Sequence, residues 1–427
     1  MAFVNRTDEL SLLKKHGQHC DFVVIFGRRR VGKTALVREW AKTGKIVYSQ
    51  AIEAATNMQI TQINQDLSRV LPSGIAQPQT WDELLGAIAL VREKVTVVID
   101  EFPYLVNSDS TLPSRLQRWL DHSKPKNVGL VLLGSSQHMM HGMFLDGTAP
   151  LYGRADRILH LKPMSYKHFC QALKLKPSER ESYVKFAMVG GVPRYWNFLR
   201  DCPNPLEAAE KLYFGDQALL SEEPDRLLRD EAIEGINARS LLEAIGRGAQ
   251  RPSEIASRMG LPQTSLSKTL QLLMQTSLIR RRLPFGESVR SSKRTLYQIQ
   301  DPCMRFWYEV FSPHQSRWNH YSAEKRLRLL NDHASKLLED SFQQLFSDCS
   351  SYWEGSLVEF DCVRFADETM KSVVISELKW SSLDPLEKKR LKVEIDQKFL
   401  SSEISRKYKL AAIEVLDFGD VSKKLAE

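Results

Sequence analysis

A glycine-bounded loop carries the residue types that hold phosphate. An apolar run, Phe22–Phe26, leads into Gly-Arg-Arg-Arg-Val-Gly-Lys-Thr and then into a segment with helical spacing. Gly27 and Gly32 let the backbone curl so that its N–H groups converge, and the helix N-terminus adds partial positive charge. Lys33 suits the β- and γ-phosphates and Thr34 suits Mg²⁺. A chance glycine–lysine turn is the alternative reading. The loop predicts nucleotide binding through its whole length, which also includes Arg28, Arg29, Arg30 and Val31.

Two acids end a second apolar run, Val95–Ile99. Asp100 is placed to hold Mg²⁺ directly or through water, and Glu101 to polarise the water that attacks the γ-phosphate. Apolar strands also end in acids simply because loops are polar. Paired with the phosphate loop, however, these two carboxylates predict hydrolysis rather than phosphoryl transfer to another group.

Two more sites in the chain place polar groups beside apolar runs. Ser135 and Ser136 follow Gly129–Gly134. Their hydroxyls would reach the γ-phosphate or the attacking water, or would only stabilise a turn. Arg154 precedes a fifth apolar run near residue 157 and would either stabilise charge on the transferred phosphate or form a surface ion pair.

Strand and helix patterns alternate through residues 1–163, which predicts an α/β fold with a parallel, doubly wound sheet. Residues 3–15 read as a helix capped by Asn5 or Thr7 that leads into the first strand. Ligands bind such sheets at the carboxyl ends of the strands. We expect residues 164–230 to form a helical lid, broken at Gly190-Gly-Val-Pro193.

Residues 231–310 have the order of a winged helix, with three helical segments followed by two short strand-like runs. Basic residues concentrate on the expected recognition helix and wing, where they suit contacts with DNA phosphates. A winged helix that binds protein, with a merely solvated basic hairpin, is the alternative. The candidate DNA contacts are Lys268, Arg280, Arg281, Arg282, Arg290, Lys293 and Arg294.

Residues 311–427 read as a small α/β domain in which a helix precedes several strands. Glu377 and Lys379 alternate onto one face of a strand, where they would meet Asp361 from the neighbouring strand. Two carboxylates can hold Mg²⁺ against a phosphate while a lysine polarises water. An exposed Glu–Lys ion pair is the alternative.

Composition is ordinary for a soluble globular chain of 427 residues, with 42% hydrophobic and 26% charged residues. A net charge of +8 permits nucleic-acid binding without establishing it. No run of about eighteen apolar residues and no signal-peptide core is present, so we expect a cytoplasmic protein without a membrane segment. Six cysteines without a C-x-x-C pair favour reduced thiols and argue against zinc.

The motifs together resemble the prokaryotic archaeal-type P-loop ATPase family, a STAND-like branch of the AAA+ group. The resemblance is carried by residues 26–34, 98–105, 133–136, 150–154, 190–196 and 301–307. It implies that the loop binds ATP and Mg²⁺ and that Asp100 is the Mg²⁺-side acid. It also implies Glu101 as catalytic base, Ser135 or Ser136 as sensor, Arg154 as the γ-phosphate-responsive arginine and Pro193 as part of a nucleotide-sensing lid motif.

The same resemblance implies a C-terminal restriction-endonuclease-like domain of the PD-(D/E)XK type, with Glu339, Asp361, Glu377 and Lys379 as its site. Phe360 and Cys362 flank the aspartate, and no Pro-Asp pair precedes it.

Three functions follow from these assignments. The first is an ATP-hydrolysing switch that acts on double-stranded DNA through the winged helix. The second is a nucleotide-gated module that binds a protein partner, with an inactive last domain. The third is an ATP-regulated, metal-dependent nuclease. An oligomer is compatible with each, since Arg154 would act within one subunit or across two.

Overall fold

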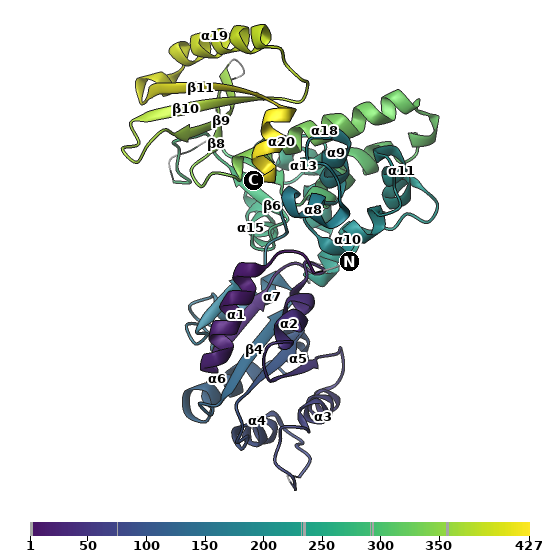
Figure 1. The fold of residues 1–427 in the computed structure, drawn as a ribbon, viewed down its shortest axis with the longest axis vertical. Helices are drawn as coiled ribbons and strands as arrows, with labels where there is room; N and C mark the ends of the chain where they lie inside the picture. Colours follow the sequence, from purple (N-terminus) through teal and green to yellow (C-terminus); the bar gives the residue numbers. More distant parts are fainter. Residues whose placement is uncertain are drawn as a thin grey trace. The chain divides into compact units, whose positions relative to one another are not determined.

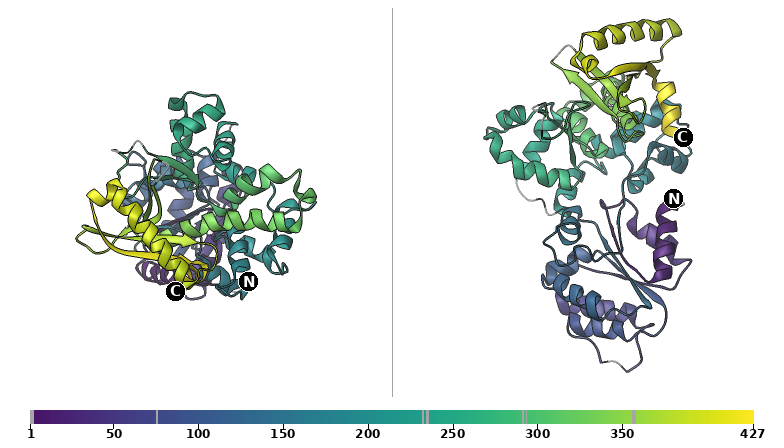
Figure 2. Two further views of the ribbon diagram at one scale, coloured as in Figure 1. Left: turned by 90° about the horizontal axis from the view of Figure 1, so that it is seen from above. Right: turned by 90° about the vertical axis from the view of Figure 1, so that its left-hand side faces the viewer.

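The computed structural model describes residues 3–74, 76–231, 233, 236–290, 292, 294–355 and 358–427. By contacts between residues, the chain divides into two compact units (Figures 1 and 2). Unit 1 comprises Met1–Pro163, Val192–Arg194 and Arg226–Ile233, and unit 2 comprises Met164–Gly191, Tyr195–Asp225 and Glu234–Glu427. The expected lid is thus shared between the two units, and most of it packs with the C-terminal half of the chain.

Unit 1 is built on a parallel five-stranded sheet with the order β2-β3-β4-β1-β5. Val, Ile, Leu and Phe fill its central strands, which are buried on both faces as parallel strands between helices require. The expected doubly wound α/β sheet is therefore present. Its strands are β1 (Phe22–Phe26), β2 (Ile46–Gln50), β3 (Val95–Asp100), β4 (Val128–Gly134) and β5 (Arg157–His160).

Helices cover both faces of this sheet (Figure 1). Leu13, Leu36 and Trp40 from α1 (Thr7–His19) and α2 (Lys33–Ala41) pack against one face. The other face carries the larger core, in which Trp81 and Trp119 are buried. That core is covered by α3 (Thr56–Leu67), α4 (Trp81–Ala89), α5 (Phe102–Ser108), α6 (Leu112–His122) and α7 (Gln137–Phe144).

The start of α1 differs from the expected cap. Arg6, in the left-handed region at φ 71°, is the N-cap residue, and no side chain caps the helix. Its guanidinium instead donates to Glu9 and to the carbonyl of Lys162, 156 residues away. The helix is therefore joined to the end of the sheet domain by a charged side chain rather than by Asn5 or Thr7.

Unit 2 begins with helices that pack around buried aromatic rings, including Tyr183, Trp196 and Tyr213. Two segments of unit 2, η2 (Glu210–Phe214) and η4 (Trp307–Phe311), have π-helical hydrogen bonding. The elements in order are α8 (Tyr166–Leu173), α9 (Arg180–Val189), α10 (Pro193–Trp196), η1 (Asn197–Leu199), α11 (Pro205–Ala209), η2 (Glu210–Phe214) and α12 (Glu223–Asp230).

Three helical segments and a two-stranded antiparallel hairpin follow, in the order expected from the sequence. Their bounds are α13 (Ile236–Gly246), α14 (Pro252–Met259), η3 (Gln263–Leu266), α15 (Ser267–Gln275), β6 (Ile279–Arg282) and β7 (Leu296–Ile299). The chain then passes through α16 (Pro302–Phe306), η4 (Trp307–Phe311), α17 (Ser312–His314), η5 (Trp318–His320) and α18 (Ala323–Gln343).

A four-stranded mixed sheet with the order β11-β10-β9-β8 forms the end of the chain. The first three strands in sequence are antiparallel neighbours, whereas β11 runs parallel to β10 after the crossover helix α19 (Figures 1 and 2). The elements are β8 (Ser350–Glu354), β9 (Val358–Phe365), β10 (Ser372–Lys379), α19 (Pro385–Ser401), η6 (Glu403–Arg406), β11 (Lys409–Asp417) and α20 (Phe418–Ala426).

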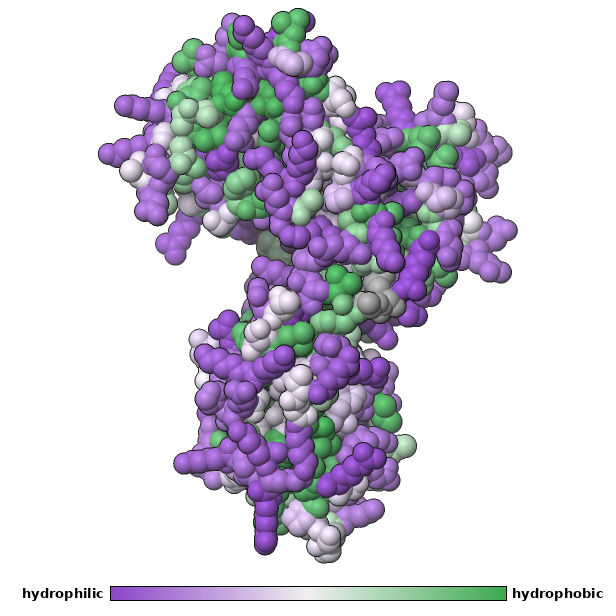
Figure 3. Space-filling view, viewed as in Figure 1, coloured by the Kyte–Doolittle hydropathy of each residue, from purple (hydrophilic) through white to green (hydrophobic). Residues whose placement is uncertain are grey.

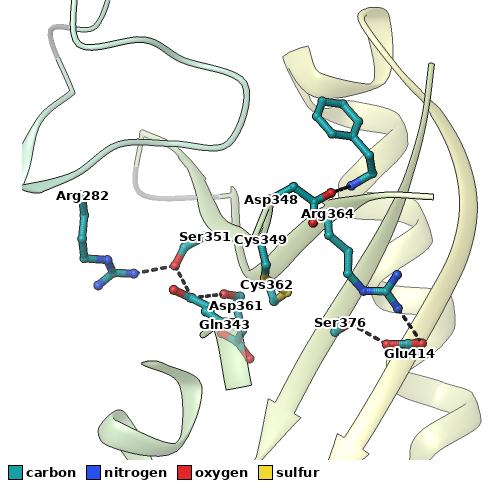
Figure 4. Close-up of a disulfide and its surroundings, with 11 residues drawn as sticks. Arg282, Gln343, Asp348, Cys349, Ser351, Asp361, Cys362, Arg364, Ser376 and Glu414 are labelled. Atoms are coloured by element: carbon teal, nitrogen blue, oxygen red, sulfur yellow. Dashed lines mark hydrogen bonds and ion pairs between the residues drawn. A yellow bond between two sulfur atoms is a disulfide. The ribbon is translucent and has the colours of Figure 1, made fainter. Parts of the chain in front are cut away.

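One expectation about the cysteines is wrong. Cys349, just before β8, forms a disulfide with Cys362 of β9 (Figure 4), whereas the sequence favoured six reduced thiols. The two cysteines are 13 residues apart, so the spacing gave no sign of the pair; adjacent antiparallel strands bring them together. The other four cysteines are buried and form no disulfide.

Hydrophilic side chains predominate on the face drawn in Figure 3. Within the described ranges, no helix has both the length and the apolar character needed to span a bilayer.

Candidate nucleotide site and C-terminal acidic cluster

The phosphate loop connects β1 to α2 and closes around Lys33. The Lys33 ammonium is buried and donates to the carbonyls of Gly27 (2.8 Å) and Arg28 (3.2 Å). Burial lowers the pKa of Lys33, while the charges of Glu101, Asp100 and Glu231 oppose that shift. Gly32 has a φ of 104°, a conformation that other residues rarely adopt, and it precedes the helix directly. The loop therefore passes through a left-handed glycine just before α2, and its lysine points inward.

Thr34 and Asp100 meet at the edge of the sheet. The Thr34 hydroxyl donates to the Asp100 carboxylate at 2.7 Å, although 66 residues separate them. Tyr48 of β2 donates to the same carboxylate oxygen at 2.7 Å, and burial and this bond raise the pKa of the tyrosine. A hydroxyl beside a carboxylate is a donor set that suits Mg²⁺, so Thr34 and Asp100 fit the metal expected here.

Glu101 and Ser135 are also brought together. Strand β4 lies between β1 and β3, so its carboxyl end falls between the phosphate loop and the acidic pair. The hydroxyl and backbone N–H of Ser135 donate to the Glu101 carboxylate at 2.6 and 3.2 Å. Glu101 itself has a φ of 58°, an unfavourable conformation for a side chain with a Cβ. Such local strain is concentrated at functional sites, and here it points the carboxylate toward Ser135.

Ser136 has a different position from Ser135. It caps α7 by accepting the N–H of Met139, and its hydroxyl lies 3.4 Å from Glu231. Glu231 is buried and also accepts the backbone N–H of His138 at 3.1 Å and the side-chain amide of Gln137 at 3.4 Å. Burial raises the pKa of Glu231 to about 7, against these hydrogen bonds.

Asp230 and Glu231 were not predicted as site residues. Asp230 forms an ion pair with Arg29 of the phosphate loop. No sequence signal indicated these contacts, because the two acids lie some two hundred residues beyond the loop in a segment that reads as ordinary amphipathic helix. The amide oxygen of Gln137 accepts a hydrogen bond from the ring of His160 at 3.0 Å, and that ring stacks on Phe26 at 4.7 Å between centroids.

Arg154 does not lie with the other candidates. It precedes β5, and its guanidinium binds Asp121 at 3.0 Å and the carbonyl of Pro150 at 2.8 Å. The backbone of Asp156, two residues on, bonds to Phe22 at the start of β1. The phosphate loop begins at the other end of that strand, roughly 15 Å away at 3.3 Å per residue. The expectation that Arg154 reaches the phosphate within one chain is therefore not met.

Pro193 is the first residue of α10, in the short Val192–Arg194 segment that clusters with unit 1. Its role as part of a nucleotide-sensing motif remains a prediction. Arg28 and Val31 are buried in the loop, and Arg30 has a positive φ of 69°.

The chain is similar to several known proteins. Residues 3–197 match the family described as ATPase domain predominantly from Archaea. This part of the chain is an archaeal-type ATPase domain. Over 417 residues the chain is 27% identical to the uncharacterized protein MJECL04 of Methanocaldococcus jannaschii, covering 91% of this chain and 90% of that protein.

Two shorter or weaker similarities point to the same domain. A 48-residue stretch, 11% of this chain, is 38% identical to the uncharacterized ATP-binding protein MJ0423 of the same organism and covers 81% of that protein. The Walker-type ATPase PABY2304 of Pyrococcus abyssi has a similar structure, with a TM-score of 0.53, 18% identity and coverage of 72% of this chain and 96% of that one. At that identity the similarity concerns the fold, a P-loop ATPase α/β sheet.

Beyond the ATPase domain, most of the expected DNA-contacting arginines are engaged inside unit 2. Arg280 of β6 is largely buried and binds Gln298 and Asp340. Arg282 donates to Ser351 of β8 (Figure 4), and Arg294 bonds to Glu287 and to the carbonyl of Trp353. The hairpin packs on the C-terminal sheet, whose core includes Phe285. These three arginines therefore bind protein groups in the structure, and their contact with DNA stays a prediction.

Two candidate DNA contacts remain exposed. Lys268 lies on α15 and Arg290 between the hairpin strands, and both are exposed to solvent. Arg281 is half-buried with its guanidinium 5.8 Å from the ring of Tyr297. Lys293 lies outside the described residues.

The C-terminal candidates gather on one side of the small sheet. The Asp361 carboxylate on β9 accepts the N–H of Leu378 at 2.7 Å, and Lys379 of β10 donates to Glu377 at 2.7 Å. Burial raises the pKa of Asp361, as does its proximity to Glu377. Burial, together with the charge of Asp361, likewise raises the pKa of Glu339 from α18. Burial opposes the shift at Lys379, but its bond to Glu377 holds that pKa above the usual value.

The acidic cluster, Glu339, Asp361 and Glu377, thus brings three carboxyl groups together, two of which have pKa values raised mainly by burial. Lys379 donates to the Glu377 carboxylate, and the backbone N–H of Leu378 donates to that of Asp361. In the part of the chain that the structure describes, however, no group of three or more histidine, cysteine, aspartate or glutamate side chains has the arrangement of a metal site. The residue types suit a divalent cation, and their present spacing does not enclose one.

Proposed function

We propose that this protein is an ATP-binding and ATP-hydrolysing molecular switch. The observation that supports it most is the meeting of Thr34 with Asp100 and of Ser135 with Glu101 at one sheet edge. Three segments far apart in sequence thereby supply a phosphate cradle, a Mg²⁺ donor pair and a carboxylate beside a hydroxyl. Mg²⁺, held by Thr34 and Asp100, would neutralise charge on the β- and γ-phosphates.

The chain's own residues then have distinct tasks. The loop N–H groups and Lys33 bind and orient the phosphates, and the Glu101 carboxylate accepts the proton of the attacking water. Ser135 holds Glu101 in place until nucleotide enters. Arg154 lies at the opposite sheet edge from the phosphate loop of its own chain. It therefore remains a candidate for stabilising charge on the transferred phosphate only across two subunits.

ATP turnover by the full chain tests this proposal. We expect Mg²⁺-dependent hydrolysis that falls at least 100-fold in Glu101→Gln, while a fluorescent ATP analogue still binds. Glu93→Gln, which removes an exposed carboxylate at the opposite sheet edge, is the matched control and should keep full activity. Hydrolysis that survives Glu101→Gln would remove Glu101 as the base, and absence of nucleotide binding would remove the whole proposal.

We further propose that the partner of the switch is double-stranded DNA, bound by the winged helix of residues 236–299 through Lys268 and Arg290. This rests on the net charge and on the order of three helices and a hairpin. Gel shifts with and without Mg²⁺-ATP test it. We expect a logarithmic salt slope that decreases by about two when both residues become alanine, because each phosphate contact contributes about 0.9.

A protein partner is the alternative reading of the same domain. It becomes the better proposal if DNA affinity stays at background in both nucleotide states. Replacement of Arg280 is no suitable probe, since its loss would disturb the buried pair with Asp340.

A second candidate function is a metal-dependent nuclease. Its support is the order α18, β8, β9, β10, α19, β11, the order of a PD-(D/E)XK-type core, with the acidic cluster and Lys379 on the expected elements. DNA cleavage with Mg²⁺ or Mn²⁺ should then disappear in Asp361→Ala and Glu377→Ala. Cleavage that is unchanged in both variants would assign it to a contaminant.

A further inference from the structure

Two neighbouring acids, Asp230 and Glu231, bind the phosphate loop and the N-terminus of α7. Asp230, the last residue of α12, is ion-paired with Arg29 of the loop. Glu231 lies at the N-terminus of α7, where it accepts the backbone N–H of His138 at 3.1 Å. The side chains of Ser136 and Gln137 donate to the same carboxylate at 3.4 Å each. Both acids thus bind donors next to the carboxyl ends of β1 and β4.

The segment that carries these acids is packed against the ATPase domain. Leu227, Leu228 and Ile233 are buried, with 3%, 6% and 5% of their surfaces exposed. By contacts, residues 226–233 belong to unit 1, whereas the first residues of α12 belong to unit 2. A segment held by apolar burial, an ion pair and helix-end hydrogen bonds is a docked element of the nucleotide site.

The negative charges of Asp230 and Glu231 compete with those of the nucleotide phosphates for the same positive groups. The Lys33 ammonium interacts favourably with Glu231 as well as with Asp100 and Glu101. A nucleoside triphosphate brings about four negative charges to the same cradle, and like charges at short range repel. The Arg29 guanidinium is 48% exposed and close to the loop, so a γ-phosphate and Asp230 would seek the same donors.

We propose that Asp230 and Glu231 form an acidic latch that nucleoside triphosphate displaces from Arg29 and from the N-terminus of α7. This inference rests on the proposed function, namely that the loop binds ATP. With the latch closed, the carboxylates neutralise the empty cradle. The γ-phosphate is the group that adds most repulsion, so a triphosphate opens the latch more completely than a diphosphate does. The latch is therefore the part of the switch that distinguishes the two nucleotides.

Binding measurements on the full chain test the competition. The double variant Asp230→Asn/Glu231→Gln should bind Mg²⁺-ATPγS at least fivefold more tightly than the natural sequence, and Mg²⁺-ADP should gain less. The control Asp82→Asn/Glu93→Gln removes two exposed acids and changes net charge equally. It should change neither affinity by more than twofold. Unchanged or weaker ATPγS binding by the latch variant would overturn the proposal.

The single variant Asp230→Asn tests the proposal even if the double variant does not fold, because it removes one partly exposed ion pair and no buried group. It should retain the thermal unfolding of the natural sequence and still bind ATPγS more tightly, by twofold or more. If it folds normally and its affinity does not increase, the proposal is wrong even if the double variant is unstable.

Hydrogen–deuterium exchange reports the opening itself. Adding Mg²⁺-ATPγS should increase exchange at backbone amides of residues 223–231, and Mg²⁺-ADP should increase it less. Protection that stays equal or rises with ATPγS would show that the segment remains docked and would overturn the latch. Lys33→Ala should show no response. If the natural chain binds no nucleotide, the proposed function fails first; if it binds nucleotide without these changes, only the latch fails.

Discussion

At the scale of single residues, the phosphate loop depends on a close approach between Gly27 and Leu161. A Cβ added to Gly27 would lie 2.4 Å from the backbone oxygen of Leu161, which itself follows β5. Backbone atoms at that position cannot move aside without shifting the strand. The loop and the sheet are therefore fitted to each other at this glycine.

Gly27→Ala should consequently destabilise unit 1 by about 1–3 kcal/mol, the usual cost of overpacking, and weaken ATP binding. Denaturant unfolding and a nucleotide titration measure the two effects. Gly44→Ala is the matched control, because open space surrounds its added methyl group. Equal stability of the two variants would contradict the contact.

The acidic cluster of the C-terminal sheet predicts a pH-dependent stability. Burial and neighbouring carboxylates raise the pKa of Glu339 above its ordinary value near 4.5. The unfolded chain therefore releases this proton at lower pH than the folded chain does. The contribution of protonated Glu339 to the free energy of unfolding is complete below about pH 4.5. It is lost as the pH rises through the pKa of Glu339 in the folded chain.

Glu339→Gln should thus increase the unfolding free energy at pH 8 by about 1–2 kcal/mol and flatten its decline between pH 5 and pH 8. Thermal and denaturant unfolding over that pH range measure both. Glu324→Gln, at the solvent-exposed start of α18, should leave the profile unchanged. A variant less stable than the natural chain at pH 8 would show that Glu339 is stabilised by contacts rather than opposed by repulsion.

The sequence predicted those site residues whose chemical types occur close together in a recognisable motif. The phosphate loop was predictable because a glycine-bounded loop that ends in lysine connects a strand to a helix. Asp100 and Glu101 were predictable because acids that follow an apolar strand lie at its carboxyl end. Arg154 does not reach the phosphate loop of its own chain, since a residue that precedes a parallel strand lies at the opposite sheet edge from one that follows it; a role across two subunits stays a prediction. Glu231 was missed because its partners are set by tertiary packing alone.

At the scale of secondary-structure elements, one buried charge network in unit 2 joins β6, α16 and α18. Asp340 of α18 binds Arg280 of β6 and Arg305 of α16, the latter at 2.6 Å. Arg305 also binds Glu309 at 2.8 Å. All three side chains at the centre of this network are buried or nearly so. The network fixes the hairpin and α16 to the long helix.

Asp340→Asn should destabilise unit 2 by about 3–5 kcal/mol, because it removes the carboxylate that Arg280 binds and leaves Arg305 paired with Glu309 alone. Denaturant unfolding measures the loss. Asp332→Asn lies on the same helix with its side chain 64% exposed and should be within about 0.5 kcal/mol of the natural chain. Similar values for the two variants would show that the network contributes little.

This network also explains why the sequence did not reveal the partners of the hairpin arginines. Alternation along β6 indicates which residues share a face, but it does not reveal that a later helix and sheet cover that face. Charge on a short hairpin reads as a nucleic-acid surface until α18 and β8 are placed. The bounds of the elements themselves were close, as β1 at Phe22–Phe26 shows.

At the scale of the whole molecule, contacts between residues group the chain into two compact units. The sequence divided residues 164–230 from their neighbours as a lid because helical patterns begin and end there. It could not show that these helices pack mainly with the C-terminal half, because amphipathic faces do not specify their partners. The division into four domains remains a prediction about function rather than about packing.

Two units predict two unfolding transitions in a calorimetric scan. Mg²⁺-ATPγS at 100 times its dissociation constant should stabilise one of them by about 2.7 kcal/mol and leave the other in place. Lys33→Ala should abolish the shift. A single transition that moves as a whole would show instead that the units unfold together.

The conformation of Glu101 has a consequence for how this protein can change over generations. A left-handed backbone at a residue with a Cβ costs about 1–2 kcal/mol, whereas glycine or asparagine adopts it readily. Glu101→Gly is therefore expected to be more stable than the natural sequence and unable to hydrolyse ATP. Where selection for turnover relaxes, substitution at this position gains stability as it loses catalysis, so inactive descendants that still bind nucleotide are an accessible outcome.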